Sequence, residues 1–144
     1  MKIYLLLFML LSCLAKPDKY ERDSQNILKL LKNWDSIKSV GTCRKIIDIR
    51  IDKFSNNVEI CQVYNEVLFS HLLFQPFEFV VYLEKNHERQ SAVYQNLASQ
   101  INDMIDLENI MGNLLGLQYS KKWISDQNLV AAKVLSIVSS NIPD

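Results

Sequence analysis

Apolar side chains recur at helical spacing along most of this chain, in runs separated by short polar stretches. The first run begins after a helix cap at Asp23 or Ser24 and ends at Gly41. Its apolar positions, three or four residues apart, are Ile27, Leu30, Leu31, Trp34, Ile37 and Val40. This spacing predicts a first amphipathic helix that buries one face.

The segment that follows has a different period. Between residues 47 and 52, isoleucine alternates with a charged residue: Ile47, Ile49 and Ile51 with Asp48, Arg50 and Asp52. A two-residue period is typical of a strand or an extended segment. Residues 54–57, Phe-Ser-Asn-Asn, then predict a turn. Since one strand cannot form a sheet, we expect an ordered, extended connection.

Helical spacing returns at Val58 and predicts three more helices. The second is bent, or divided in two, at Gln75-Pro76, because proline removes an amide donor and crowds the preceding turn. A polar break at 85–88 precedes the third, which runs from Val93 through Ile110 to an end near Gly112. The fourth spans residues 114–138, with a possible break near 125–126. Only three Gly and three Pro favour an all-α fold, and the order of elements predicts a four-helix bundle with an extended connection after the first helix. If that connection crosses the bundle, the topology is up-up-down-down.

The first fifteen residues have the features of a secretory signal peptide. Lys2 is followed by the apolar run 3–11, and the small residues Cys13 and Ala15 precede a cleavage point. The run is too short to span a bilayer. We therefore expect a signal peptide at 1–15, one domain at 16–144, a secreted product and no membrane insertion after cleavage. A bacterial lipoprotein is the alternative, because residues 10–13 loosely mimic a lipidation box.

Charge and motifs exclude several functions. The formal net charge is zero, which argues against nucleic-acid and acidic-membrane partners. The chain has no motif of a metalloprotease, P-loop, hydrolase or dinucleotide site, so we expect no enzyme and no cofactor. His71 is interpreted as a surface or boundary residue, and His87-Glu88 lacks the second histidine of a metalloprotease motif. Asp103, Asp106 and Glu108 are interpreted as a solvated acidic face.

Two cysteines remain after the expected cleavage, Cys43 and Cys61. An even pair in an oxidising compartment predicts a structural disulfide. A reactive thiol or a metal site is the alternative. The two cysteines and the two histidines fit no zinc spacing, so we expect no metal.

Several segments resemble the interleukin-6 family, viral homologues included. They are the first helix with its Thr42-Cys43-Arg44-Lys45 exit, Cys61 to Glu66, Glu78-Phe79-Val80-Val81-Tyr82-Leu83-Glu84, Leu117-Gln118 followed by Trp123, and the tail from Val134. Their order is that of the family. The resemblance implies a secreted helical cytokine, of up-up-down-down type, that clusters class I cytokine receptors and activates JAK/STAT signalling.

The chain also departs from the family. Of its three cysteines, two remain after the expected cleavage where the family usually has four, so a disulfide would join Cys43 to Cys61, and its first connection is shorter. Residues 139–141 replace the basic end of the family's last helix, which contributes to alpha-receptor binding. The resemblance therefore implies a receptor of the glycoprotein-130 type more firmly than an interleukin-6 receptor alpha subunit.

By analogy with this family, we expect receptor contacts in two places. Trp123 is the first, since a large amphipathic ring near a helix start suits a binding hot spot. The alternative for Trp123 is burial between helices. The second site combines two outward faces, whose residues are Lys29, Lys32 and Asn33 on the first helix and Arg89, Gln95, Asn102 and Asp103 on the third. Ordinary surface solvation is the alternative for each of them.

Two rival functions share the expected fold. A secreted helical carrier would enclose an apolar ligand in a cavity lined by residues 72–79 and the aromatic side chains around them. A cytokine of another helical family, interleukin-10-like or leptin-like, would share the mechanism and differ in its receptor.

Overall fold

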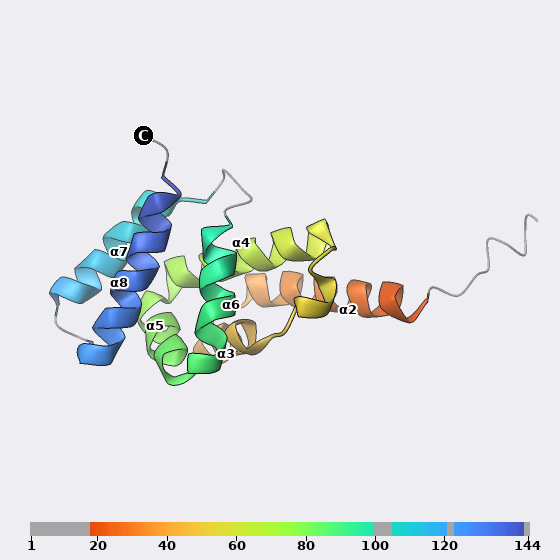
Figure 1. The fold of residues 1–144 in the computed structure, drawn as a ribbon, viewed down its shortest axis with the longest axis horizontal. Coiled ribbons are helices and arrows are strands. Elements are labelled where there is room, and N and C mark those ends of the chain that lie inside the picture. Colours follow the sequence, from red (N-terminus) through yellow and green to blue (C-terminus); the bar gives the residue numbers. More distant parts are fainter. Residues whose placement is uncertain (1–17, 100–104, 121–122, 143–144) are drawn as a thin grey trace, which may run out of the picture.

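The computed structural model describes residues 18–99, 105–120 and 123–142. These residues form α-helices joined by short connections, without a strand among them (Figure 1). The elements are α2 (Lys19–Ser36), α3 (Val40–Asp48), the 3-10 helix η1 (Asp52–Phe54), α4 (Val58–Phe74), α5 (Pro76–Lys85), α6 (His87–Ala98), α7 (Leu107–Tyr119) and α8 (Ser125–Ser140). The all-helical prediction is confirmed for this part of the chain. The expected signal peptide, residues 1–15, lies outside the described residues.

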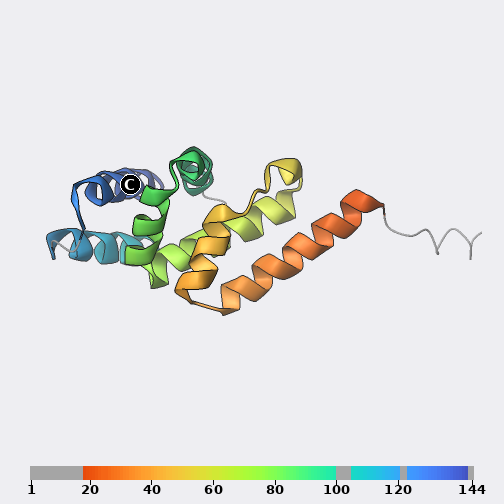
Figure 2. The same cartoon turned by 90° about the horizontal axis from the view of Figure 1, so that it is seen from below.

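α2 and α4 lie side by side and run in the same direction (Figures 1 and 2). Near their starts, the ammonium of Lys53, just before α4, lies 3.0 Å from the carboxylate of Asp23 in α2. Near their ends, the imidazole of His71 in α4 lies 3.2 Å from the carbonyl oxygen of Trp34 in α2. α3 and η1 connect the end of α2 to the start of α4 and return the chain along the length of the pair. The first two long helices are therefore parallel.

A sharp bend follows α4. Its axis and that of α5 meet at 113°. Pro76 occupies the first turn of α5, where its missing N–H is no loss, and Gln75 between the helices has non-helical dihedral angles. The predicted division at Gln75-Pro76 is confirmed.

The predicted extended connection is wrong for most of its length. Residues 40–48 are helical, and Gly41, expected to end the first helix, lies inside α3. α3 begins because the Ser39 hydroxyl accepts a hydrogen bond from the backbone N–H of Thr42. Ile46 and Ile47 are both fully buried on α3. In an extended segment with one face against the core, two consecutive side chains would point to opposite faces, and one of them would be exposed.

The third and fourth predicted helices are also divided differently. α6 ends at Ala98, and a new helix, α7, begins at Leu107 with the Asp106 carboxylate accepting from the N–H of Asn109. Gly112, expected at a helix end, lies inside α7. The break expected near residues 125–126 is found just before them, since α8 begins at Ser125.

The core lies around α5, which packs against α3, α4, α6, α7 and α8. Phe79, Val80 and Leu83 are fully buried on this helix. α7 and α8 pack against one another at the far end of the molecule from the start of α2 (Figure 1). No single helix in the described ranges is long and apolar enough to cross a membrane, although the bent pair α4–α5 passes that test when its two parts are taken together.

The expected disulfide is not formed in this structure, where Cys43 and Cys61 are both free thiols. Cys43 is buried on α3, close enough to α5 for the charge of Glu78 to act on it, and burial raises the pKa of its thiol to about 12. Cys61 lies in the first turn of α4, with its sulfur 3.6 Å from the carbonyl oxygen of Ser55. A disulfide requires the two Cα atoms within about 7 Å, and the helices hold the cysteines in different neighbourhoods.

Candidate protein-binding surface

α2 turns one face to solvent, and this face is the candidate site. Leu31 is fully buried on the opposite side, against the core, which fixes the rotation of the helix. We name the solvent-facing side the α2 outer face and define it by Asn26, Lys29, Leu30, Lys32 and Asn33. The predicted exposure of Lys29, Lys32 and Asn33 is thus confirmed.

The α2 outer face combines one apolar side chain with four polar or charged ones. Four of its residues, Asn26, Lys29, Leu30 and Asn33, share one side of the helix and line a shallow, open part of the surface. Leu30 is 43% exposed and is the apolar member. Lys32 lies 3.5 Å from the carboxylate of Glu59, but both side chains are more than 60% exposed, so water screens this pair strongly. An apolar side chain surrounded by lysine and amide groups can contact a protein surface of opposite charge.

The predicted contribution of the third helix is wrong at Arg89. This side chain is 7% exposed, and its guanidinium donates hydrogen bonds to the backbone carbonyls of Ile47, at 3.0 Å, and Ile49. Arg89 therefore ties α6 to the end of α3 and is not available to a partner. Gln95 is exposed on α6 as expected, whereas Asn102 and Asp103 lie outside the described residues.

The structure does not bring the two predicted faces together. α2 and α6 both pack against α3 and α4, and Figure 2 shows them on opposite sides of α4. A partner that covers the α2 outer face would not reach Gln95 on α6 through the same flat contact. The composite receptor site expected from the sequence is therefore divided in two.

Trp123 is buried, which is the alternative that the sequence left open for it. Its side chain is 5% exposed, and its ring stacks on Phe77 of α5, with centroids 6.4 Å apart and planes 4° apart. The indole N–H has no hydrogen-bond partner among the described residues. Trp123 therefore joins the α7–α8 connection to α5, and it cannot be a receptor contact without leaving the core.

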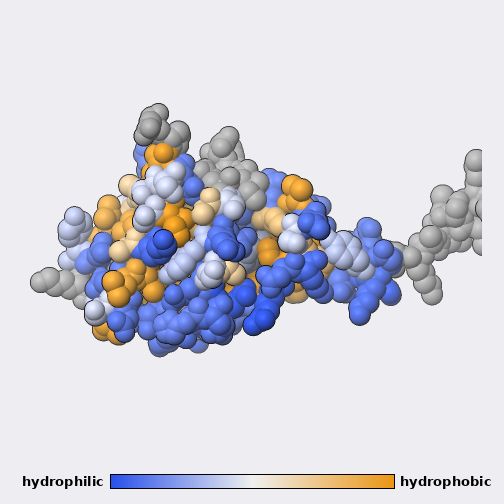
Figure 3. All heavy atoms as spheres, viewed as in Figure 1, coloured by the Kyte–Doolittle hydropathy of each residue, from blue (hydrophilic) through white to orange (hydrophobic). Residues whose placement is uncertain are grey.

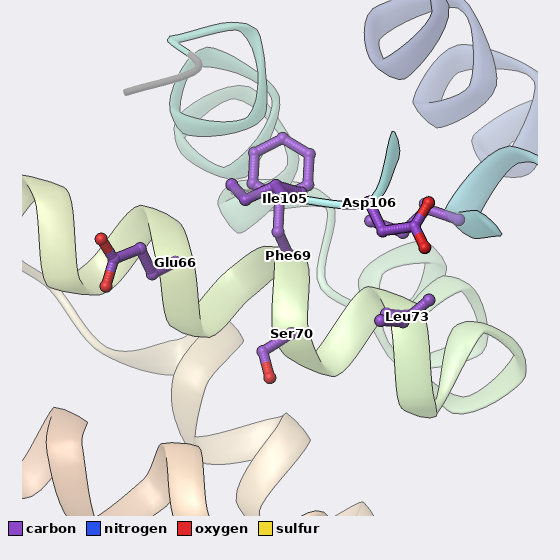
Figure 4. Close-up of a pocket in the computed structure, with 7 residues that line it drawn as sticks. Glu66, Phe69, Ser70, Leu73, Ile105 and Asp106 are labelled. Carbon is purple, nitrogen blue, oxygen red and sulfur yellow. The ribbon is translucent and has the colours of Figure 1, made fainter. Parts of the chain in front are cut away.

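Two hollows lie between helices. One, of about 190 Å³, separates α3 from α5 beside Arg44, Phe77 and Tyr82. The other, of about 200 Å³, lies between α4 and the start of α7, where Phe69 points toward Ile105 and the carboxylates of Glu66 and Asp106 stand on either side (Figure 4). Both are smaller than the pockets that enclose a typical small-molecule ligand.

Other exposed apolar side chains of the described residues lie at and between α7 and α8, among them Tyr119, Ile124 and Leu129. In the view of Figure 3, hydrophilic residues cover most of the lower edge of the molecule, and hydrophobic atoms show in smaller groups between them. Among the described residues, no group of three histidine, cysteine or carboxylate side chains is placed to hold a metal ion.

Comparisons with protein-family models, curated proteins and solved structures found no match for this chain. A function must therefore be argued from the residues and from the geometry of the α2 outer face.

Proposed function

We propose that this protein is an extracellular signalling ligand that binds a cell-surface receptor through the α2 outer face. The observation that carries this proposal is the placement of α2. This helix packs mainly on α4 and α3, and its other side presents Lys29, Leu30 and Asn33 together on one exposed face. A rigid helix with an apolar anchor and a polar surround is a common way to bind a protein groove.

The receptor class in this proposal is the class I cytokine receptor of the glycoprotein-130 type. The parallel α2 and α4 suit an up-up-down-down cytokine arrangement, which is part of the proposal. The Glu78 to Glu84 segment that resembles the interleukin-6 family forms α5, at the centre of the core. Clustering of two receptor chains would activate JAK/STAT signalling, with no reaction catalysed by the protein itself.

The carrier function receives less support. The segment expected to line a ligand cavity includes Leu72 and Phe79, which are both fully buried in the core. The hollow between α3 and α5 and the one between α4 and α7, about 190 and 200 Å³, would each hold one apolar side chain and not a lipid.

A charge-reversal experiment tests the proposal. The secreted protein and its Lys29→Glu/Lys32→Glu variant are measured for binding to the isolated glycoprotein-130 ectodomain and for STAT phosphorylation in cells with and without the alpha subunit. We expect binding by the unmodified protein and at least roughly tenfold weaker binding by the variant, since rim and anchor contacts typically contribute above 1 kcal/mol together.

The matched control is Lys133→Glu, which reverses one exposed lysine on α8, far from α2 along the fold. This variant should bind like the unmodified protein. Absence of binding to the ectodomain together with absence of STAT phosphorylation would remove the receptor class. Binding that Lys29→Glu/Lys32→Glu leaves unchanged would remove the α2 outer face as the site.

A further inference from the structure

His71 is a buried imidazole at the contact between α4 and α2. Its side chain is fully buried, and its Nε2 lies 3.2 Å from the carbonyl oxygen of Trp34. A carbonyl can only accept, so Nε2 carries the proton and donates it there. The other ring nitrogen, Nδ1, is buried without a hydrogen-bond partner among the described residues. A second proton on this ring would therefore be placed where nothing accepts it.

The charges around His71 do not compensate for a second proton. Burial is the largest influence and lowers the pKa of the imidazole from its ordinary value. The ammonium of Lys38, in the α2–α3 connection, also lowers this pKa by repulsion. Asp35 at the end of α2 acts in the opposite direction, but its carboxylate lies 2.7 Å from that same ammonium and is half exposed. His71 is therefore held neutral at neutral pH.

α2 is the helix that this imidazole contacts, and most of its other apolar contacts are only partly buried, namely those of Ile27, Leu28 and Trp34 against the core. Only Ser24 and Leu31 are buried among its eighteen residues. The buried Ser24 hydroxyl has no partner among the described residues, and the Asp23–Lys53 and Lys32–Glu59 ion pairs are exposed. Exposed pairs contribute little. Because α2 touches mainly α4 and α3, it can separate while the contacts among α4 to α8 persist.

We infer that acidification releases α2 from α4: a proton taken up at Nδ1 of His71 gives a buried cation against Lys38, and the helix separates to let water reach it. The separated state has the ordinary histidine pKa of 6.5, and the packed state a lower one. Packing of α2 is therefore at full strength above pH 6.5 and weakens as the pH falls below it, because the open state then binds more protons. The further consequence, loss of the α2 outer face as a receptor contact at acidic pH, rests on the proposed function. The release itself does not.

Hydrogen exchange of the full chain tests the release directly. Protection factors of amides in α2 are compared with those in α5 and α8 between pH 7 and pH 5, after correction for intrinsic exchange. We expect α2 protection to fall by up to roughly thirtyfold, the limit set by an open-state pKa of 6.5, while α5 and α8 keep theirs.

The chain offers a matched control, because it has two histidines and the other, His87, is exposed on α6. His71→Gln retains a hydrogen-bond donor toward the carbonyl of Trp34 but cannot take up a proton. This variant should therefore remove the pH dependence of hydrogen-exchange protection in α2. His87→Gln should leave it unchanged. A second signal comes from Trp34 in a Trp123→Phe background, whose fluorescence should shift to the red as α2 separates and water reaches its ring.

Several outcomes would overturn the inference. They are an α2 protection that does not change between pH 7 and pH 5, a loss of protection that includes α5 and α8 to the same extent, and a transition that persists in His71→Gln. If His71→Gln does not fold, an NMR titration of the unmodified protein decides. His71 must then titrate below pH 6.5 together with the α2 exchange, and a titration at or above 6.5 refutes the switch. Receptor binding is measured in a separate experiment. The pH dependence of α2 can therefore be interpreted even if the proposed function fails.

Discussion

α2 and α5 show that the length of a helix does not determine how firmly it is held. α2 has eighteen residues and buries two of them, whereas α5 has ten and buries three, all apolar and all without exposed surface. α2 packs mainly on two neighbours and α5 on five. The free energy of burial follows apolar area removed from water, so α5 contributes more to stability per residue. The comparison separates α5, which is held from all sides, from α2, which keeps one face exposed to solvent.

The largest effect is expected from truncation in α5. Phe79→Ala should lower the free energy of unfolding by about 4 kcal/mol, since it removes a fully buried ring and leaves a cavity among five helices. Urea denaturation followed by circular dichroism measures it. Phe74→Ala is the matched control, because that ring is 61% exposed, and its effect should stay below about 1 kcal/mol. Equal effects for the two variants would contradict the central role of α5.

A somewhat smaller loss is expected at the buried guanidinium of α6. Arg89→Met should lower the free energy of unfolding by about 3 kcal/mol. The reason is that the backbone carbonyls of Ile47 and Ile49 lose a charged hydrogen-bond donor while they stay partly or wholly buried. Thermal unfolding compares it with Arg50→Met, which removes an exposed arginine next to the same segment. If both variants have the melting temperature of the unmodified protein, the hydrogen bonds of Arg89 do not hold α6 against α3.

A truncation in α2 should have a smaller and more local effect. Leu31→Ala removes the one fully buried apolar side chain of this helix, and we expect a loss of about 2 kcal/mol that appears as faster hydrogen exchange in α2 alone. Leu30→Ala, one residue away on the α2 outer face, should leave that exchange unchanged. Simultaneous loss of protection in α5 would show that the two helices unfold as one unit, against the comparison above.

The smallest effect is expected at the start of α2. Lys53 hydrogen-bonds to the Asp23 carboxylate and holds its pKa below the ordinary 3.8. A lowered carboxyl pKa stabilises the fold above pH 3.8, and this contribution disappears as the pH falls through the lowered value. Lys53→Met should raise the pKa of Asp23 toward 3.8, as followed by an NMR titration of its carboxyl carbon. Lys19→Met, a weaker neighbour, should shift it less.

Prediction from sequence succeeded where the cause is local. Pro76 ends α4 and begins α5 because its ring excludes the preceding helical hydrogen bond, whatever packs around it. The outward position of Lys29, Lys32 and Asn33 follows from the helical period around Leu31. These two features define the bend of the core and the α2 outer face.

Prediction from sequence failed where the conformation or burial of a residue depends on a side chain far away in the chain. The alternation of Ile47, Ile49 and Ile51 suggested an extended chain, yet Ile47 lies in α3, with a capping serine at its start and Arg89 at its end. No spacing within residues 40–52 reveals a guanidinium that arrives from forty residues further along. The same holds for Trp123, whose environment depends on Phe77 of another helix.

The sequence by itself determined that the described chain is helical, where one of its sharp bends falls and which side of the first helix meets water, since these depend on neighbours within a few residues. Only the tertiary structure decided that Arg89 and Trp123 are buried, that Cys43 and Cys61 stay apart, and that His71 lies against α2. Burial and pairing are properties of two surfaces in contact, and the pattern along one helix specifies only one of them.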